Sequence, residues 1–423
     1  MHLNQRKTRK QNTFSVATLT VFMCVCGVYL ISCYHTRFRI GEIRSISEHY
    51  NNPSIQHKFD YLHREKTTVG DDVDVVADAD PDSFDCKALI RDFLGQTIDE
   101  MERVAGYEKS YITRTITENS FYFATHGGDI DRARVSSFVK GAYYEGKLSR
   151  RVTETFLAKR AGRKKSIMLD VGGNVGWFSL LAAAHGASRV YTFEPNVANN
   201  VRFCEALGLN GWLHDDRSKD FVVPIGKGVS NGSGTEELYR VDATNPGSYS
   251  FLKEYAYKNA ISERARTEYL NAIANDTSRN FTEFFTEADR IEHMKTAVVG
   301  KVDVITLDSF AERRGWFESR PSIGFFKLDV EGSEHLVLQG ARKILESRLI
   351  ENIAMEIKAD HTGENKKFIV KTLFDAGYGL HMHGGFKGPN KVVKKIYGTW
   401  EELVGDIMKN VYRENVLFRL RHR

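Results

Sequence analysis

The chain has 423 residues, of which 41% are hydrophobic, enough for one large domain with a buried core and additional segments. Its formal net charge of +5 comes mostly from the N-terminus, because four basic side chains within the first ten residues leave 56 basic against 55 acidic residues elsewhere. This balance argues against nucleic acid as a partner.

The cysteines exclude a disulfide-rich scaffold and offer no zinc motif to a folded domain. Three of the five lie in one apolar run near the N-terminus, which leaves Cys86 and Cys204. Two such thiols are more often simply buried than bridged, and a single Cys86–Cys204 disulfide is the alternative.

Residues 14–34 carry no charge, and as a helix they would span about 30 Å, the thickness of a bilayer core. No small-residue cleavage site follows, which favours an uncleaved anchor over a signal peptide. The basic residues within 1–13 predict a cytoplasmic tail. We therefore expect a single-pass type II membrane protein whose catalytic part lies in the lumen of the endoplasmic reticulum or Golgi.

Three N-glycosylation acceptors agree with a lumenal domain, at Asn231, Asn275 and Asn280. Residues 35–85 include an acidic stretch at 71–82 and are predicted to form a stem or linker. Asp-x-Asp triplets in that stretch are interpreted as solvated linker rather than a metal site.

Residues 86–165 are predicted to form a mainly helical cap. From residue 166 to 423, short apolar runs alternate with helical patterns, which predicts an α/β fold with a Rossmann-like sheet covered by helices on both faces. Strands are expected at the runs 167–169, 189–193, 221–223, 302–305, 324–328, 353–356 and 416–418. A polar insertion at about 242–296 is expected to form either a lid or acceptor site, or a surface excursion carrying glycans.

The first strand ends in a pattern typical of a nucleoside site. Asp170 is followed by Gly172, Asn174 and Gly176 before a helix starts near Trp177, so the backbone can turn tightly. The next strand ends at Glu194, 24 residues after Asp170, where a carboxylate can accept both ribose hydroxyls.

The same residues favour S-adenosylmethionine over a dinucleotide. A carboxylate at the position of Asp170 would repel a pyrophosphate but can pair with the amino group of the methyl donor. The dinucleotide fingerprint also requires a glycine where this chain has Asn174.

Several blocks make the chain similar to one family. It resembles the FkbM-type methyltransferases from about residue 166 to 418, through the segments LDVGGNVG (169–176), FEPN (193–196), TLDS (306–309), KLDVEGSE (327–334) and VLQGA (337–341). The resemblance implies that Asp170, Gly172 and Glu194 hold the donor. It further implies loop-shaping roles for Asn174, Gly176 and Asn196 and an adenine site near Val229, Ser230 and Asn231. A glycan on Asn231 would crowd that site, which predicts an unused sequon.

Methyl transfer to a hydroxyl needs an aligned acceptor and a base. Strand alternation places Lys327, Asp329 and Glu331 together at the carboxyl end of a strand, the ligand edge of such sheets. Asp329 is the predicted base or acceptor-binding group, and Glu331 shares that role or caps the next helix. Lys327 is expected either to pair with Asp329 or to bind an acidic acceptor.

The other polar residues are predicted to have structural rather than catalytic roles, and no metal is predicted. Glu334 and His335 are expected to be exposed on the helix, and Asp308 to cap a helix. His381 and His383 share a strand face and are interpreted as an ordinary hydrogen-bonded pair.

Together these features predict a membrane-anchored S-adenosylmethionine-dependent O-methyltransferase that acts on a glycan hydroxyl in the secretory pathway. The alternatives are a methyltransferase for a small metabolite or lipid, a non-catalytic interaction protein with the same fold, and a glycosyltransferase. No oligomeric state is predicted.

Overall fold

The structure, a computed structural model, describes parts of the unit Leu62–Arg423. The described residues are 82–95, 110–127, 143–214, 220–242, 245–260, 286–357, 363–383, 391–392, 397–409 and 415–421, with single positions at 265, 268, 271 and 272. The expected anchor at 14–34, most of the stem and the sequons at Asn275 and Asn280 lie outside them. Within the described part, none of the helices combines the length and the apolar composition needed to cross a membrane.

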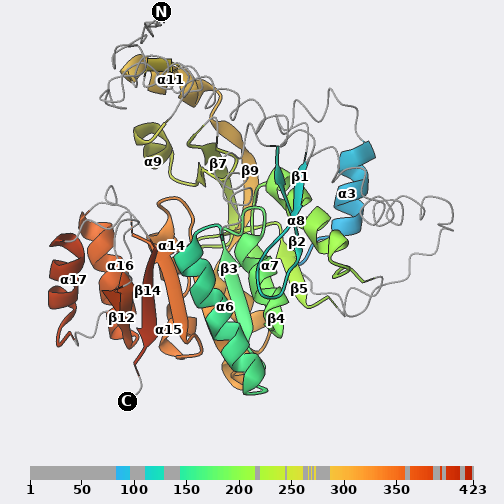
Figure 1. The fold of residues 1–423 in the computed structure, drawn as a ribbon. Coiled ribbons are helices and arrows are strands. Elements are labelled where there is room, and N and C mark those ends of the chain that lie inside the picture. Colours follow the sequence, from blue (N-terminus) through green and yellow to red (C-terminus); the bar gives the residue numbers. More distant parts are fainter. Residues whose placement is uncertain are drawn as a thin grey trace, which may run out of the picture. The chain divides into compact units, whose positions relative to one another are not determined.

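An eight-stranded sheet forms the centre of the fold (Figure 1), in the order β13-β12-β14-β11-β10-β3-β4-β5. Its five strands from β11 to β5 are parallel, and β14 runs antiparallel to both β11 and β12. The bounds are β3 Ile167–Val171, β4 Arg189–Phe193, β5 Val222–Ile225, β10 Ile323–Leu328, β11 Asn352–Glu356, β12 Tyr378–His383, β13 Lys391–Val392 and β14 Asn415–Leu420. The predicted mixed α/β fold with a central sheet is confirmed.

Alternate residues of each central strand enter two different cores, which places packed helices on both faces of the sheet. In β3, Leu169 and Val171 belong to one core and Met168 to the other. Helices α12 Leu307–Arg313, α13 Trp316–Ser319, α14 Glu334–Gln339, α15 Arg342–Glu346, α16 Gly363–Asp375 and α17 Trp400–Lys409 contribute to the first core. Helices α3 Cys86–Gly95, α6 Gly146–Ala161, α7 Trp177–Ala184 and α8 Val197–Leu209 contribute to the second.

A second sheet departs from the sequence expectation. The predicted strand at 302–305 is the end of β9 Val298–Ile305, and it pairs outside the main sheet in the order β6-β9-β7-β8. Its other strands are β6 Gly228–Val229, β7 Gly234–Arg240 and β8 Tyr249–Ser250, and α9 Lys253–Lys258 and α11 Glu287–Lys295 follow β8 in the chain. The excursion from the main sheet therefore runs from β6 to β9, wider than the expected insertion.

The described part of the segment predicted as a mainly helical cap contains the helices α3 and α6 and also a β-hairpin. Residues 110–126 form an antiparallel hairpin, β1 Ser110–Arg114 and β2 Tyr122–His126. The aromatic rings of this hairpin pack into the core: the ring centroids of Phe121 and Phe123 lie 5.6 and 5.4 Å from that of Trp177, and all three residues are buried. Tertiary packing thus outweighs the local pattern from which helix was predicted.

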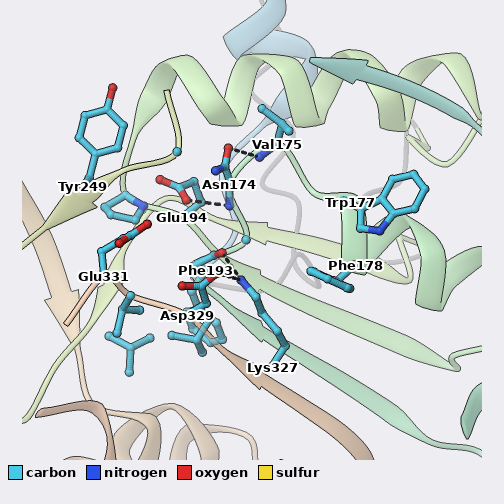
Figure 2. Close-up of a pocket in the computed structure, with 18 of the residues that line it drawn as sticks. Asn174, Val175, Trp177, Phe178, Phe193, Glu194, Tyr249, Lys327, Asp329 and Glu331 are labelled. Atoms are coloured by element: carbon cyan, nitrogen blue, oxygen red, sulfur yellow. Dashed lines mark hydrogen bonds and ion pairs between the residues drawn. The ribbon is translucent and has the colours of Figure 1, made fainter. Parts of the chain in front are cut away.

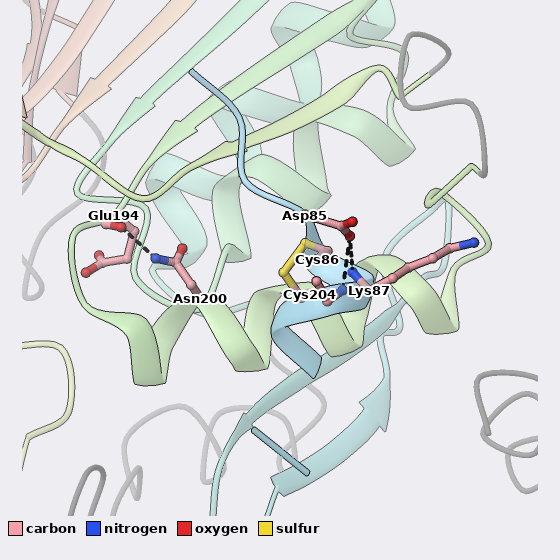
Figure 3. Close-up of a disulfide and its surroundings, with 7 residues drawn as sticks. Asp85, Cys86, Lys87, Glu194, Asn200 and Cys204 are labelled. Atoms are coloured by element: carbon pink, nitrogen blue, oxygen red, sulfur yellow. Dashed lines mark hydrogen bonds between the residues drawn. A yellow bond between two sulfur atoms is a disulfide. The ribbon is translucent and has the colours of Figure 1, made fainter. Parts of the chain in front are cut away.

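Cys86 and Cys204 form a disulfide that joins α3 to α8 (Figure 3), so the less expected alternative is the one the structure contains. Helix α3 starts beside Asp85, whose Oδ1 accepts hydrogen bonds from the backbone N–H of Lys87 and Ala88. Near its start, α8 is tied to the end of β4, because Asn200 Nδ2 donates to the backbone oxygen of Glu194 at 2.7 Å. The bridge therefore braces the helix that follows a predicted donor residue.

Candidate active site

A cavity opens at the carboxyl ends of β3, β4 and β10, where the strand order reverses on either side of β3. This is the edge at which doubly wound sheets bind ligands. The cavity and its open mouth together enclose about 760 Å³ of empty space. Of the predicted residues, those lining it are Gly172, Asn174, Glu194, Lys327, Asp329 and Glu331, together with Val229.

The glycines of the loop after β3 are required by the protein's own packing. Gly172 has φ +77°, and a Cβ there would lie 1.8 Å from the backbone oxygen of Asp329. Gly176 has φ +84°, and its Cβ would lie 2.0 Å from the Phe203 ring. These residues therefore allow the ends of β3 and β10 to approach and α7 to pack on α8. Gly176 itself does not line the cavity.

Asn174 and Glu194 connect the carboxyl ends of β3 and β4 (Figure 2). Asn174 has φ 51°, and its side chain accepts a hydrogen bond from the backbone N–H of Val175 at 2.8 Å. The backbone N–H of Asn174 donates to Glu194 Oε2, and that of Asn196 donates to Oε1, both at 2.8 Å. Each carboxylate oxygen can accept a further bond, so hydroxyl groups of a ligand can still be bound.

Burial raises the pKa of Glu194 to about 7, because only 6% of the residue is exposed and the backbone hydrogen bonds only partly offset the lost hydration. Asn196 lies outside the cavity, where it caps α8 by accepting the N–H of Ala198 at 3.0 Å. Asn196 thus shapes the loop after Glu194 by capping the helix that follows it.

Asp170 lies beneath the cavity rather than in its wall, and it is fully buried. Ser179 Oγ donates to its Oδ2 at 2.6 Å, and its Oδ1 lies 3.9 Å from Lys327 Nζ. Burial raises the pKa of Asp170, although Lys327 and Ser179 oppose the shift. Its contact with the amino group of a methyl donor stays a prediction.

Lys327 and Asp329 form the expected ion pair, with Nζ and Oδ2 3.3 Å apart. Lys327 Nζ also donates to the backbone oxygen of Gly172 at 2.8 Å, which joins β10 to the loop after β3 (Figure 2). Burial disfavours the charge of Lys327, but the carboxylates of Asp329 and Asp170 outweigh it and hold its pKa above the usual value. Asp329 is the more accessible partner, with 26% of its side chain exposed against 5% for Lys327.

Glu331 lies in the turn after β10, where it lines the cavity, and its backbone has φ 51°. The expectation of an exposed Glu334 is wrong, because that residue is fully buried and accepts the backbone N–H groups of Val330 and Gly332. Glu334 therefore shapes the turn that carries Glu331, whereas His335 is half-buried.

The predicted adenine region is only partly at the cavity. Gly228 and Val229 line it, but Ser230 is buried elsewhere and Asn231 is exposed, with its Nδ2 donating to Gln339 Oε1 at 3.0 Å. The crowding argument against glycosylation of Asn231 therefore does not hold, because its side chain lies outside the cavity. That this sequon is unused stays a prediction.

The remaining polar candidates are structural. Asp308 does cap a helix, but it is α15 rather than its own, since it accepts the N–H groups of Lys343 and Ile344 at 2.9 and 2.8 Å. His381 is half-buried in β12, where burial lowers its pKa; the side chain of His383 is outside the described part. Among described residues, no group of three His, Cys, Asp or Glu side chains is arranged to hold a metal ion.

Sequence reasoning missed part of the wall. Tyr144 and Glu145 come from the turn before α6, and Gly247, Tyr249 and Phe251 come from the start of the predicted insertion. In Figure 2, Tyr249 and Glu331 lie on one side of Glu194, and Trp177 and Phe178 on the other. The expected lid or acceptor role of the insertion was the available signal for Tyr249, and no local pattern indicated Glu145.

Comparison with known proteins gives a family for this site. Residues 170–380 match the family model described as methyltransferase FkbM domain. Among solved structures, the chain is similar to methyltransferase FkbM from Methylobacillus flagellatus KT, with 14% sequence identity and a TM-score of 0.31. That likeness covers 60% of this chain and 43% of the other, so the match spans less than half of that protein's length. No curated protein matches the chain. Through its domain at residues 170–380, the chain belongs to the FkbM methyltransferases.

Proposed function

We propose that the chain is an S-adenosylmethionine-dependent O-methyltransferase, anchored in the membrane through residues 14–34, that methylates a hydroxyl of a glycan in the secretory pathway. One observation carries the chemistry: a single cavity is lined both by a carboxylate suited to ribose, Glu194, and by a carboxylate suited to act as base, Asp329. The sheet, with its site at the strand ends, supports the Rossmann-like arrangement expected of class I methyltransferases.

The residues at the cavity fit S-adenosylmethionine. Glu194 would accept hydrogen bonds from ribose hydroxyls, and its negative charge favours a cationic ligand. The loop from Gly172 to Val175 forms the adjoining wall. When bound, this donor supplies an electrophilic methyl group on a positively charged sulfur.

Asp329 would take the proton. It lines the cavity, is partly exposed, and its Oδ2 lies 3.3 Å from Lys327 Nζ, an ion pair that orients the carboxylate. Asp329 would accept the proton of the acceptor hydroxyl as that oxygen takes up the methyl group, which the bound donor would supply. Lys327 cannot be the base, because its neighbours hold its ammonium in the charged form.

Two features support a lumenal catalytic domain. The Cys86–Cys204 disulfide is of a kind that persists in oxidising compartments and is rare in the cytosol. The sequon at Asn231 is exposed, so an oligosaccharyltransferase could reach it. Both agree with the basic residues before the proposed anchor, which favour a cytoplasmic N-terminus.

Calorimetry with S-adenosylmethionine, followed by transfer of labelled methyl into glycans extracted from secretory membranes, tests the chemistry. We expect Glu194→Gln to weaken donor binding at least tenfold and Asp329→Asn to abolish transfer while donor binding persists. Asp375→Asn is the matched control, because its side chain is 53% exposed on α16 and does not line the cavity. A wild-type chain that does not bind the donor refutes the proposal.

Protease protection in sealed vesicles tests the orientation. A lumenal domain is protected until detergent is added, and digestion of the domain in intact vesicles would instead place the reaction on the cytoplasmic side, with a metabolite or lipid as acceptor.

A further inference from the structure

Part of the cavity wall comes from a segment outside the family-matched residues. Tyr144 and Glu145 belong to the turn before α6, whereas the match begins at residue 170. They line the same cavity as Asp329, the group assigned above to the acceptor hydroxyl. This segment is therefore positioned to contact a ligand bound in the cavity.

The turn is held in a definite position. The backbone oxygen of Glu145 accepts the N–H of Ser149 at 3.0 Å, and that of Tyr144 accepts the Ser149 hydroxyl at 2.5 Å. The same hydroxyl accepts the indole N–H of Trp177 at 2.8 Å, and Trp177 is the first residue of α7. The turn is thus fixed to the helix that follows the donor loop.

Glu145 also has a costly backbone conformation, with φ 44° and ψ 54°. Six non-glycine residues of the described chain have positive φ, and three of them line this cavity: Asn174, Glu331 and Glu145. Such conformations persist where the surrounding structure holds them, and they concentrate at functional sites. Glu145 shares this property with a residue of the donor loop and a residue of the turn after β10.

The charged side chains that line the cavity are mostly negative. Glu145, Asp329 and Glu331 bring three carboxylates, and among the described lining residues Lys327 brings the one positive charge. The Lys327 ammonium is engaged by the protein, at 2.8 Å from the Gly172 oxygen, 3.3 Å from Asp329 and 3.9 Å from Asp170. It is 4% exposed, so it is not placed to bind an acidic acceptor, the alternative raised by the sequence.

We propose that Glu145 helps to select an uncharged, polyhydroxylated acceptor, and that the cavity disfavours acceptors bearing a carboxylate, sulfate or phosphate. The proposal rests on the proposed function and narrows its substrate class. A carboxylate accepts hydrogen bonds from hydroxyl groups, and an anion here would meet like charges at Glu145, Asp329 and Glu331, whereas Lys327 is the one cation among the described residues of the wall. The rings of Tyr144, Tyr249 and Phe251 add apolar faces against which a sugar ring can pack.

Matched glycosides test this inference in the full-length chain, with the demethylated donor S-adenosylhomocysteine present so that no transfer occurs. The probes are p-nitrophenyl glucoside against glucuronide, and galactoside against galacturonide, each as both anomers. The members of each pair differ only in carrying a hydroxymethyl or a carboxylate group. We expect the wild-type chain to bind at least one neutral member at least tenfold more tightly than its acidic partner.

Three variants test whether Glu145 causes this preference, measured as the ratio of the affinity for the neutral glycoside to that for its acidic partner. Glu145→Lys should reduce the ratio at least tenfold, and Glu145→Gln should reduce it about threefold while preserving the side-chain shape. Glu154→Lys is the matched control, since it makes the same charge change on α6 at a side chain that is 51% exposed and outside the cavity. It should leave the ratio as in the wild type.

The outcomes separate this inference from the proposed function. Tighter binding of the acidic members, equal effects of the two lysine variants, or no binding of any glycoside by a chain that binds S-adenosylmethionine would overturn the acceptor class alone. A chain that fails to bind S-adenosylmethionine would overturn the proposed function itself. Donor binding by each variant also confirms that it is folded.

Discussion

The buried carboxyl of Glu194 should make the stability of the ligand-free protein depend on pH in a way that one substitution removes. Its pKa is about 7 in the folded chain against an ordinary value of 4.5. The folded state therefore holds this proton more tightly than the unfolded state. The resulting stabilisation is complete below pH 4.5 and is lost as the pH rises through about 7.

The magnitude follows from these two values. At pH 5 the difference in proton binding stabilises the folded chain by about 2.5 kcal/mol, and at pH 8 by less than about 0.1 kcal/mol. Glu194→Gln removes the titration. It also deprives one backbone N–H of its acceptor, at a cost of about 1–3 kcal/mol that does not vary with pH.

The assay is urea unfolding of the wild type and Glu194→Gln at pH 5 and pH 8, followed by the fluorescence of the buried tryptophans. Other titrating groups cancel in the comparison of the two proteins. The unfolding free energy of the variant minus that of the wild type should be about 2.5 kcal/mol larger at pH 8 than at pH 5. A difference between the two proteins that is the same at both pH values would refute the reasoning.

Further expectations concern the donor, the ion pair, the disulfide and the glycine turn. Calorimetry should find S-adenosylmethionine binding about tenfold weaker at pH 6 than at pH 8, because the ionised Glu194 is the form that accepts both hydroxyls; equal affinities would contradict this. Lys327→Met should lower the unfolding free energy by about 3–5 kcal/mol in urea, because it leaves carboxylates without their cation. Cys204→Ser should lower it by about 2–5 kcal/mol, since the bridge spans 118 residues of sequence, and a reductant should affect the wild type but not the variant. Gly172→Ala should lower the thermal midpoint far more than Gly211→Ala, because both have positive φ but a Cβ at Gly211 meets nothing within 4 Å; similar midpoints would show that backbone conformation, not the close approach, sets the requirement.

The placement of Glu194 and of the Lys327–Asp329 pair was predictable because it depends on local rules. A residue that ends a parallel strand lies at the ligand edge, and alternation places residues 327 and 329 together. The position of Glu145 follows no such rule. It depends on a bond between Ser149 and Trp177, 28 residues apart, and on a left-handed backbone conformation that glutamate seldom adopts. Likewise, the need for glycine at 172 comes from a contact with Asp329, which is distant in sequence.

The two halves of the cavity are built differently, and this has a consequence for specificity. The half proposed to hold the donor is built on the main sheet, through Glu194 after β4 and the hydrogen bond from Lys327 Nζ to the Gly172 backbone oxygen. Much of the other half is carried by the turn at Glu145 and by residues 247–251, which lie outside the main sheet. The backbone hydrogen bonds to Glu194 and the ion pair of Asp329 with Lys327 come from other segments. If Glu145 selects the acceptor as proposed above, a substitution such as Glu145→Lys should change acceptor preference while Glu194 and Asp329 keep these contacts, and the two segments are then the place to redesign specificity.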